Sequence, residues 1–147
     1  MESSQPHNAT RELIVTTARS LLQPRVRFKP YGRNPKYGLD CIGVVEWVGK
    51  QVGCVEADFK LPRYSFPPQQ EIFELFDTYA VRRDDLAHGS IAVFHRAEIP
   101  QHTGVVVWVD EMWKYVGVDI SQYRPWVTMT PIEMKYLWRV YDYRMSE

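Results

Sequence analysis

The stretch that decides the fold is Tyr37–Gly53, "YGLDCIGVVEWVGKQVG", in which a cysteine opens a long apolar run. Asp40 is a residue type that caps the start of helices, and Gly53 is a type that ends them. Between them, Cys41 and four valines recur every three or four residues, which predicts a buried helix. A buried strand is the competing structure, but the segment is too long for one. Two roles stay open for the thiol on this stretch alone, a small core residue or a nucleophile.

The composition suits one domain with one hydrophobic core. The chain has 147 residues, of which 45% are hydrophobic. We therefore expect a single domain over residues 1–147, with residues 1–7 as a flexible tail. Acidic and basic side chains both number 18, so a net charge of zero gives no general attraction for nucleic acid. No apolar run approaches the ~20 residues of a membrane helix, and we expect no membrane span.

The N-terminus and the cysteines bear on the compartment. "MESSQPHNAT" lacks the basic and apolar regions of a cleaved signal peptide, so we expect synthesis in the cytoplasm. Cys41 and Cys54 would lie about 20 Å apart along a helix, which is too far for a disulfide bond. Their spacing is not that of a zinc site either, so we expect two free thiols, with no metal and no cofactor. We interpret Cys54 as a packing residue.

The rest of the chain predicts an α+β order, with N-terminal helices packed on an antiparallel sheet of about five strands. Helical periodicity marks residues 8–22 and 68–79. The period then changes to two, which predicts strands at 90–96, 102–110, 111–119 and 137–145, with a tight turn at 110–111. The segment 123–129 predicts an edge strand, because Pro125 restricts it to the rim. A proline-containing capping box at 130–133 predicts a short helix before the last strand.

The candidate chemistry joins a thiol to an imidazole. A thiol at a helix start faces unpaired amides and the positive end of the helix dipole, and both lower its pKa. Asp40 opposes this effect unless it turns away to cap the helix. His102 begins the most apolar strand, where a base is rigidly held yet reachable. A thiol at a helix end and an imidazole at a sheet edge form the layout of papain-like cysteine catalysis.

Three blocks in this order resemble the NlpC-type cell-wall cysteine peptidases, in particular their phage tail branch. The likeness spans roughly residues 10 to 144. The blocks are Asp40-Cys41-Ile42-Gly43-Val44, Gly89-Ser90-Ile91-Ala92-Val93-Phe94 and Gln101-His102-Thr103-Gly104-Val105. The resemblance implies a papain-like fold with Cys41 as nucleophile at the start of the central helix and His102 as base. It also implies hydrolysis of amide bonds in peptidoglycan stem peptides, commonly between γ-D-glutamate and a diamino acid. Phage tail proteins are then expected partners, and the virion tail or the cell wall the expected location.

The chain departs from the family pattern at the third catalytic position, which is usually a polar residue that orients the imidazole. Strand parity places Tyr115 there, and Lys114 is the alternative. The tyrosine that often precedes the nucleophile corresponds to Phe28, so Tyr31 would have to supply a hydroxyl near the oxyanion.

By the same resemblance, we expect an oxyanion and substrate region formed by Asp40, Phe28, Tyr31 and Arg33. Two other functions stay open at this point. One is a weak or inactive structural module of a phage tail. The other is an acyltransferase or deamidase built on the same layout.

Overall fold

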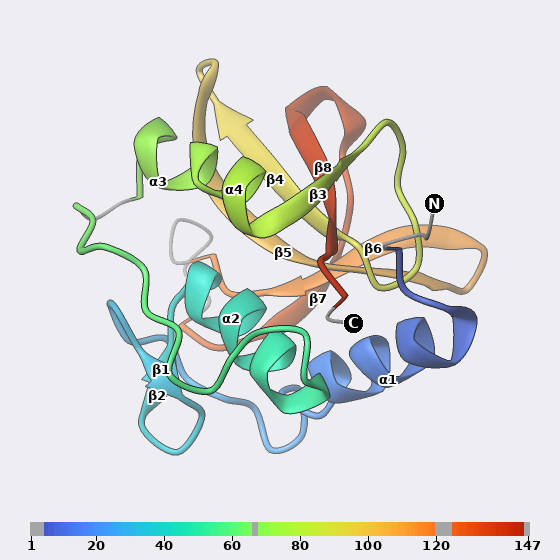
Figure 1. Ribbon diagram of the computed structural model, residues 1–147, viewed down its shortest axis with the longest axis horizontal. Coiled ribbons are helices and arrows are strands. Elements are labelled where there is room, and N and C mark those ends of the chain that lie inside the picture. The colour runs from blue at the N-terminus through green and yellow to red at the C-terminus, as the bar shows by residue number, and fades with distance from the viewer. Residues whose placement is uncertain (1–4, 66–67, 120–124, 146–147) are drawn as a thin grey trace.

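The computed structural model of the protein describes residues 5–65, 68–119 and 125–145, and it places helices against an antiparallel sheet (Figure 1). The helices are α1 (Asn8–Arg19), α2 (Cys41–Val52), α3 (Gln70–Glu74) and α4 (Phe76–Tyr79). The main sheet contains β3 (Ala80–Arg83), β4 (Ile91–Arg96), β5 (Ile99–Val109), β6 (Met112–Gly117), β7 (Thr128–Pro131) and β8 (Leu137–Tyr143). A small hairpin, β1 (Arg33–Asn34) and β2 (Gly38–Leu39), precedes α2. The predicted α+β class is confirmed.

The six strands lie in the order β3-β8-β4-β5-β6-β7, and neighbouring strands are antiparallel. The strand beyond the expected five is β3, which follows α4 without a turn and is only four residues long. A segment of four residues is too short to show the alternation of apolar and polar residues that predicts a strand. At the other edge, a strand lies at the rim as expected, but β7 overlaps the predicted segment 123–129 only at residues 128 and 129. Pro125 precedes the strand, and residues 123 and 124 lie outside the described residues. Residues 1–4 of the predicted tail also lie outside them.

Helix α2 has the predicted bounds and the predicted caps. The Asp40 carboxylate accepts a hydrogen bond from the Gly43 N–H at 2.7 Å, and Gly53 ends the helix with φ of 83°. Gly43 also permits a close approach of the preceding loop, because a Cβ there would lie 2.1 Å from the Gly32 carbonyl oxygen. The start of the helix is therefore held by its own cap and by the chain that leads into β1.

Two turns differ in how well the sequence predicted them. Asp110 and Glu111 have φ of 54° and 57°, the left-handed pair of a two-residue hairpin, as expected. The capping box predicted at 130–133 does not form, because Pro131 ends β7 and pairs with Lys114, and the short helix before the last strand begins only at Met134. An edge strand tolerates a proline, and the next element is a single 3₁₀ turn, Met134–Tyr136, without a side-chain cap.

The sheet separates two clusters of buried side chains. The helix-side cluster lies where α1 and α2 cover one face of the sheet (Figure 1); it includes Ile14, Cys41, Val44, Val48, Val105 and Val107. The outer cluster on the opposite face consists of Ala92, Phe94, Val106 and Tyr115. Alternate residues of β5 therefore serve opposite faces. Within the described ranges, none of the helices has the length and apolar character to cross a bilayer.

Candidate active site

Cys41 is the first residue of α2 and is buried, with 5% of its surface exposed. Burial raises the pKa of its thiol well above the ordinary value, and the neighbouring Asp40 carboxylate raises it further. The backbone N–H groups of Thr103 and Ile42 act in the opposite direction, but they are weaker. The helix start alone was expected to lower the pKa of the thiol, but burial raises it. The thiol is therefore protonated at neutral pH.

The Asp40 carboxylate is fully buried and anchors the chain around the start of the helix. Besides the Gly43 N–H, it accepts hydrogen bonds from the Tyr31 N–H at 3.0 Å and from Arg33 at 2.9 Å. The Tyr64 hydroxyl donates a further, short hydrogen bond to it. Asp40 thus joins three separate segments at the thiol.

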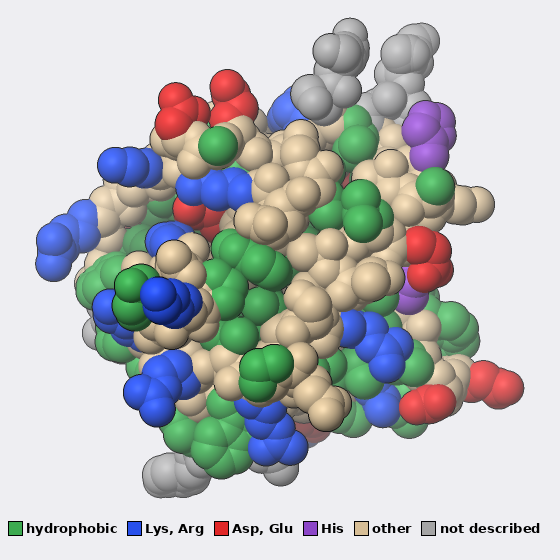
Figure 2. Space-filling model, turned by 90° about the horizontal axis from the view of Figure 1, so that it is seen from below, with side chains coloured by type: hydrophobic (Ala, Val, Ile, Leu, Met, Phe, Trp, Pro, Cys, Tyr) green, Lys and Arg blue, Asp and Glu red, His purple; other side chains and the backbone are tan. Residues whose placement is uncertain are grey.

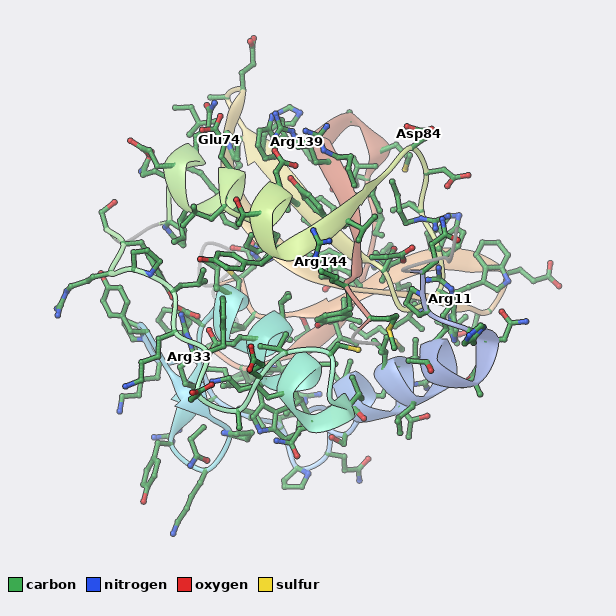
Figure 3. The ribbon with its side chains drawn as sticks, viewed as in Figure 1. Arg11, Arg33, Glu74, Asp84, Arg139 and Arg144 are labelled. Carbon is green, nitrogen blue, oxygen red and sulfur yellow. The ribbon has the colours of Figure 1, made fainter. Side chains whose placement is uncertain are left out.

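Arg33 extends this network along α2 (Figure 3). Its guanidinium donates to Tyr64 Oη at 2.7 Å and pairs with buried Glu46 at 3.1 Å. Lys50 pairs with the same Glu46 carboxylate at 3.0 Å. Two cations, Arg33 and Lys50, therefore balance the two buried carboxylates of Asp40 and Glu46.

The structure does not unite the whole expected oxyanion and substrate region. Tyr31 has a left-handed φ of 61°, and its hydroxyl donates to the Tyr64 carbonyl at 2.6 Å. That hydroxyl is engaged with the loop before α3. The Phe28 N–H donates to the Pro125 carbonyl at 2.7 Å. Arg33 and the Tyr31 backbone both meet Asp40, whereas the Tyr31 hydroxyl and the Phe28 N–H connect loops instead.

His102 lies on β5 with 6% of its surface exposed. Its ring stacks on Phe94 with centroids 5.8 Å apart and meets the Tyr115 ring edge-to-face at 5.4 Å. Burial lowers the pKa of His102 to about 4; Asp119 partly offsets this and Arg96 adds to it. The imidazole is therefore neutral near pH 7 and able to accept a proton.

Tyr115, rather than Lys114, contacts the imidazole. The Tyr115 hydroxyl lies 3.2 Å from His102 Nε2. Lys114 pairs instead with Asp110 at 3.8 Å near the hairpin turn. Burial raises the pKa of Tyr115 above its ordinary value, so the hydroxyl keeps its proton at neutral pH.

Cys41 and His102 approach the same point of β5 from different sides. Cys41 belongs to the helix-side cluster and lies by the N–H of Thr103, whereas the His102 ring packs on the outer cluster. In the part of the chain that the structure describes, no hydrogen bond joins the thiol to the imidazole. Catalytic hydrogen bonds are often long in substrate-free proteins and shorten when substrate binds.

A polar cavity of about 420 Å³ adjoins the imidazole. Its walls include His102, Tyr115, His95, Glu133 and the ion pair Arg96–Asp119, which is 2.5 Å long. The negative charge of the Asp119 carboxylate raises the pKa of Cys41, His102 and Tyr115 alike.

Sequence reasoning missed Tyr64, Arg96 and Asp119. Tyr64 reaches Asp40 across 24 residues, and Arg96 reaches Asp119 across 23. No local sequence pattern predicts contacts between residues so far apart in the chain. Among the described residues, there is also no group of three or more His, Cys, Asp and Glu side chains that could hold a metal ion.

Several solved structures share this architecture, and two of them illustrate it. One is a lipoprotein-like protein of the NLP/P60 family from Staphylococcus aureus, with a TM-score of 0.65 over 99% of this chain. The other is the NlpC/p60 domain of the peptidoglycan hydrolase SagA, with a TM-score of 0.57 over 90%. The fold is that of NlpC/P60 domains.

Sequence identity to both structures is 14%, so the likeness shows the fold alone. This chain spans 46% of the Staphylococcus aureus chain and 97% of the SagA domain. No family model and no curated protein matches the sequence.

Proposed function

We propose that this protein is a cysteine peptidase that hydrolyses amide bonds in peptidoglycan stem peptides. One observation carries the proposal: the thiol at the start of α2 lies against Thr103, the residue that follows the neutral imidazole of His102. The same fold occurs in the peptidoglycan hydrolase SagA. The substrate class follows from this likeness and from the Asp-Cys-x-Gly and histidine-strand motifs of the sequence.

Because the thiol rests protonated and the imidazole neutral, the reaction begins with general-base catalysis rather than with a preformed ion pair. His102 takes the thiol proton as the sulfur bonds to the carbonyl carbon of the scissile amide. The imidazolium then gives that proton to the leaving nitrogen, and the C–N bond breaks to leave a thioester. Water attacks the thioester, loses a proton to His102, and releases the acid and the thiol.

Two groups support these steps. The Cys41 N–H is the first amide of α2 and has no acceptor within the helix, so it can donate to the oxyanion of each tetrahedral intermediate. The Tyr115 hydroxyl holds His102 Nε2, which leaves Nδ1 to exchange the proton with the sulfur and the leaving nitrogen. Tyr115 therefore takes the orienting position that Lys114 does not reach.

Basic side chains surround the approach to α2. Figure 2 shows Lys and Arg gathered on the side of the molecule where the β1–β2 hairpin lies. Arg25, Arg27, Lys29 and Lys36 are exposed there. Wall stem peptides carry carboxylates, and this charge favours their approach. The proposal has two finer parts. One is that the bond cleaved joins γ-D-glutamate to the diamino acid, and the other is that the protein associates with a phage tail. They rest on the motif resemblance alone.

Digestion of purified peptidoglycan tests the function. The wild-type protein should release stem-peptide fragments that mass spectrometry identifies, and Cys41→Ala should release none while keeping its circular dichroism spectrum. Equal fragment release by both proteins would refute the proposal.

A non-catalytic module of a phage tail is the second candidate. The buried thiol and the missing hydrogen bond between Cys41 and His102 in the described structure favour it. Absence of any cleavage by the wild-type protein, together with its detection in purified virions, would support this candidate. An acyltransferase or deamidase would use the same thioester, and its products would carry an added amine or have lost ammonia.

A further inference from the structure

The two ends of β5 carry different side chains on the same face of the sheet. His102 lies near one end, and Trp108 lies at the other, six residues on. Figure 1 shows that the tip of the β5–β6 hairpin lies beside the start of α1. Trp108 pairs in register with Trp113, and their rings meet edge-to-face with centroids 4.8 Å apart.

An open hollow of about 640 Å³ adjoins the two tryptophans. Asn8, Arg11, Glu12 and His88 line it together with Trp108 and Trp113. The polar side chains of its wall are held in place by hydrogen bonds. His88 Nδ1 accepts a hydrogen bond from the backbone N–H of Trp108 at 2.9 Å, and His88 Nε2 lies 3.1 Å from the Glu12 carboxylate.

Arg11 fixes the floor of the hollow. It donates to the His88 carbonyl at 3.1 Å and pairs with the buried Asp142 carboxylate at 2.9 Å. The polar groups are thus positioned by the fold before any ligand arrives.

We propose that this hollow binds the pyranose rings of a polysaccharide. A pyranose ring has one apolar C–H face and a rim of hydroxyl groups. The electron-rich face of an indole attracts such C–H groups, and the edge-to-face pair leaves ring surface uncovered. The Glu12 carboxylate and the Asn8 amide can accept and donate hydrogen bonds at the sugar rim.

Stability does not account for both tryptophans. Trp113 packs against the outer cluster and contributes to it. Trp108 stays 47% exposed, so about half of its surface contributes nothing to the core. Aromatic rings next to charged groups suit a polar ligand with one apolar face.

The position of the hollow adds a consequence that rests on the proposed function. Alternation along β5 puts Trp108 on the same face as His102, roughly 20 Å away at the rise of a strand. A polymer can occupy the hollow while one of its side branches reaches His102. A short soluble stem peptide reaches His102 alone.

Titration with a soluble N-acetylglucosamine tetramer tests the binding itself by isothermal calorimetry. The wild-type protein should bind it saturably, and Trp108→Ala should weaken the affinity at least tenfold while its circular dichroism spectrum stays that of the folded protein. Tyr79→Ala is the matched control, because Tyr79 is 48% exposed but lies on α4, away from the hollow. No saturable binding by the wild type, or equal affinity in Trp108→Ala, would overturn the proposal.

A second measurement compares a polymeric with a soluble substrate. Trp108→Ala should lower kcat/KM on intact peptidoglycan about tenfold and leave kcat/KM on a soluble stem peptide unchanged. Equal losses on both substrates would contradict the polysaccharide site. If the wild type cleaves neither substrate, the proposed function fails, and the titration still decides whether the sugar site exists.

Discussion

One cysteine begins α2 and the other lies just beyond its C-terminal cap, and the two thiols have different surroundings. Cys41 lies at the start of the helix beside Asp40 and next to the strand that carries His102. Cys54 follows the helix end directly, is half-buried, and contacts the Met145 sulfur at 3.6 Å. Burial raises the pKa of both thiols, but only Cys41 also has charged and amide groups arranged around it.

The groups around a cysteine, rather than the residue type, decide whether its thiol can act as a nucleophile. A helix start offers amides to an oxyanion, whereas a helix end offers carbonyl groups. His102 is a further neighbour that Cys54 lacks. Substitutions at the two cysteines therefore form a matched pair that tests the proposed function.

The largest effect should come from the thiols themselves. We expect Cys41→Ala to lower the rate of peptidoglycan cleavage by roughly 10⁴-fold or more, because the thioester cannot form. Cys54→Ala should stay within about twofold of wild type, since its thiol only packs. Release of muropeptides over time measures both rates. A Cys54→Ala variant that loses as much activity as Cys41→Ala would contradict the assignment.

The next largest effect concerns the base. Removal of a general base costs about 10²–10⁴-fold, so we expect His102→Ala to lose activity in this range. The pKa of His102 is lowered to about 4, so activity should be level near neutral pH and should fall as the pH drops through about 4. The rate profile between pH 3 and pH 9 measures this. A loss of activity already near pH 6.5 would show that the imidazole is not buried as described.

Arg33 should matter for stability at the Cys41 end of the helix. Arg33→Gln leaves the buried Asp40 carboxylate without its cation, which should lower the free energy of unfolding by roughly 3 kcal/mol. Arg82→Gln is the control, because the Arg82–Asp77 pair is exposed and its loss should cost under about 1 kcal/mol. Urea unfolding measures both variants. Equal losses would mean that the Asp40 network does not anchor the helix start.

The thiols should also differ in the absence of substrate. A protonated and buried thiol alkylates slowly, so we expect iodoacetamide to modify Cys54 at least about tenfold faster than Cys41 near neutral pH. Peptide mass spectrometry of a time course measures the two rates. Faster alkylation of Cys41 would replace the general-base mechanism by a preformed thiolate–imidazolium pair.

The smallest effect should come from the orienting residue. Tyr115→Phe removes one hydrogen bond to His102, which is worth ~1 kcal/mol and should lower kcat roughly fivefold. Lys114→Ala should leave kcat unchanged, because Lys114 pairs with Asp110 instead. The reverse order of effects would restore Lys114 as the third residue.

Local patterns predicted the elements that local chemistry determines. Asp40 and Gly53 mark both ends of α2, and the turn at Asp110–Glu111 follows from the alternation on either side. Strand β3 was missed because four residues after a helix carry no period of their own.

Within the site, sequence placed Cys41 and His102 on the elements where they are found. The sign of the Cys41 pKa shift was not predictable, because it depends on burial by residues distant in sequence. The same holds for Tyr64 and Asp119, whose partners lie more than 20 residues away. Tertiary packing decides which charges meet, and no local stretch of sequence carries that information.

Mass spectrometry of an acid-quenched reaction tests the nucleophile most directly. Trypsin places the two cysteines on separate peptides, Tyr37–Lys50 for Cys41 and Gln51–Lys60 for Cys54. During turnover of a stem peptide, a thioester adduct with the mass of the N-terminal product less one water should appear on Tyr37–Lys50. Turnover without this adduct, or with the adduct on Gln51–Lys60, would contradict the assignment of Cys41 as the nucleophile.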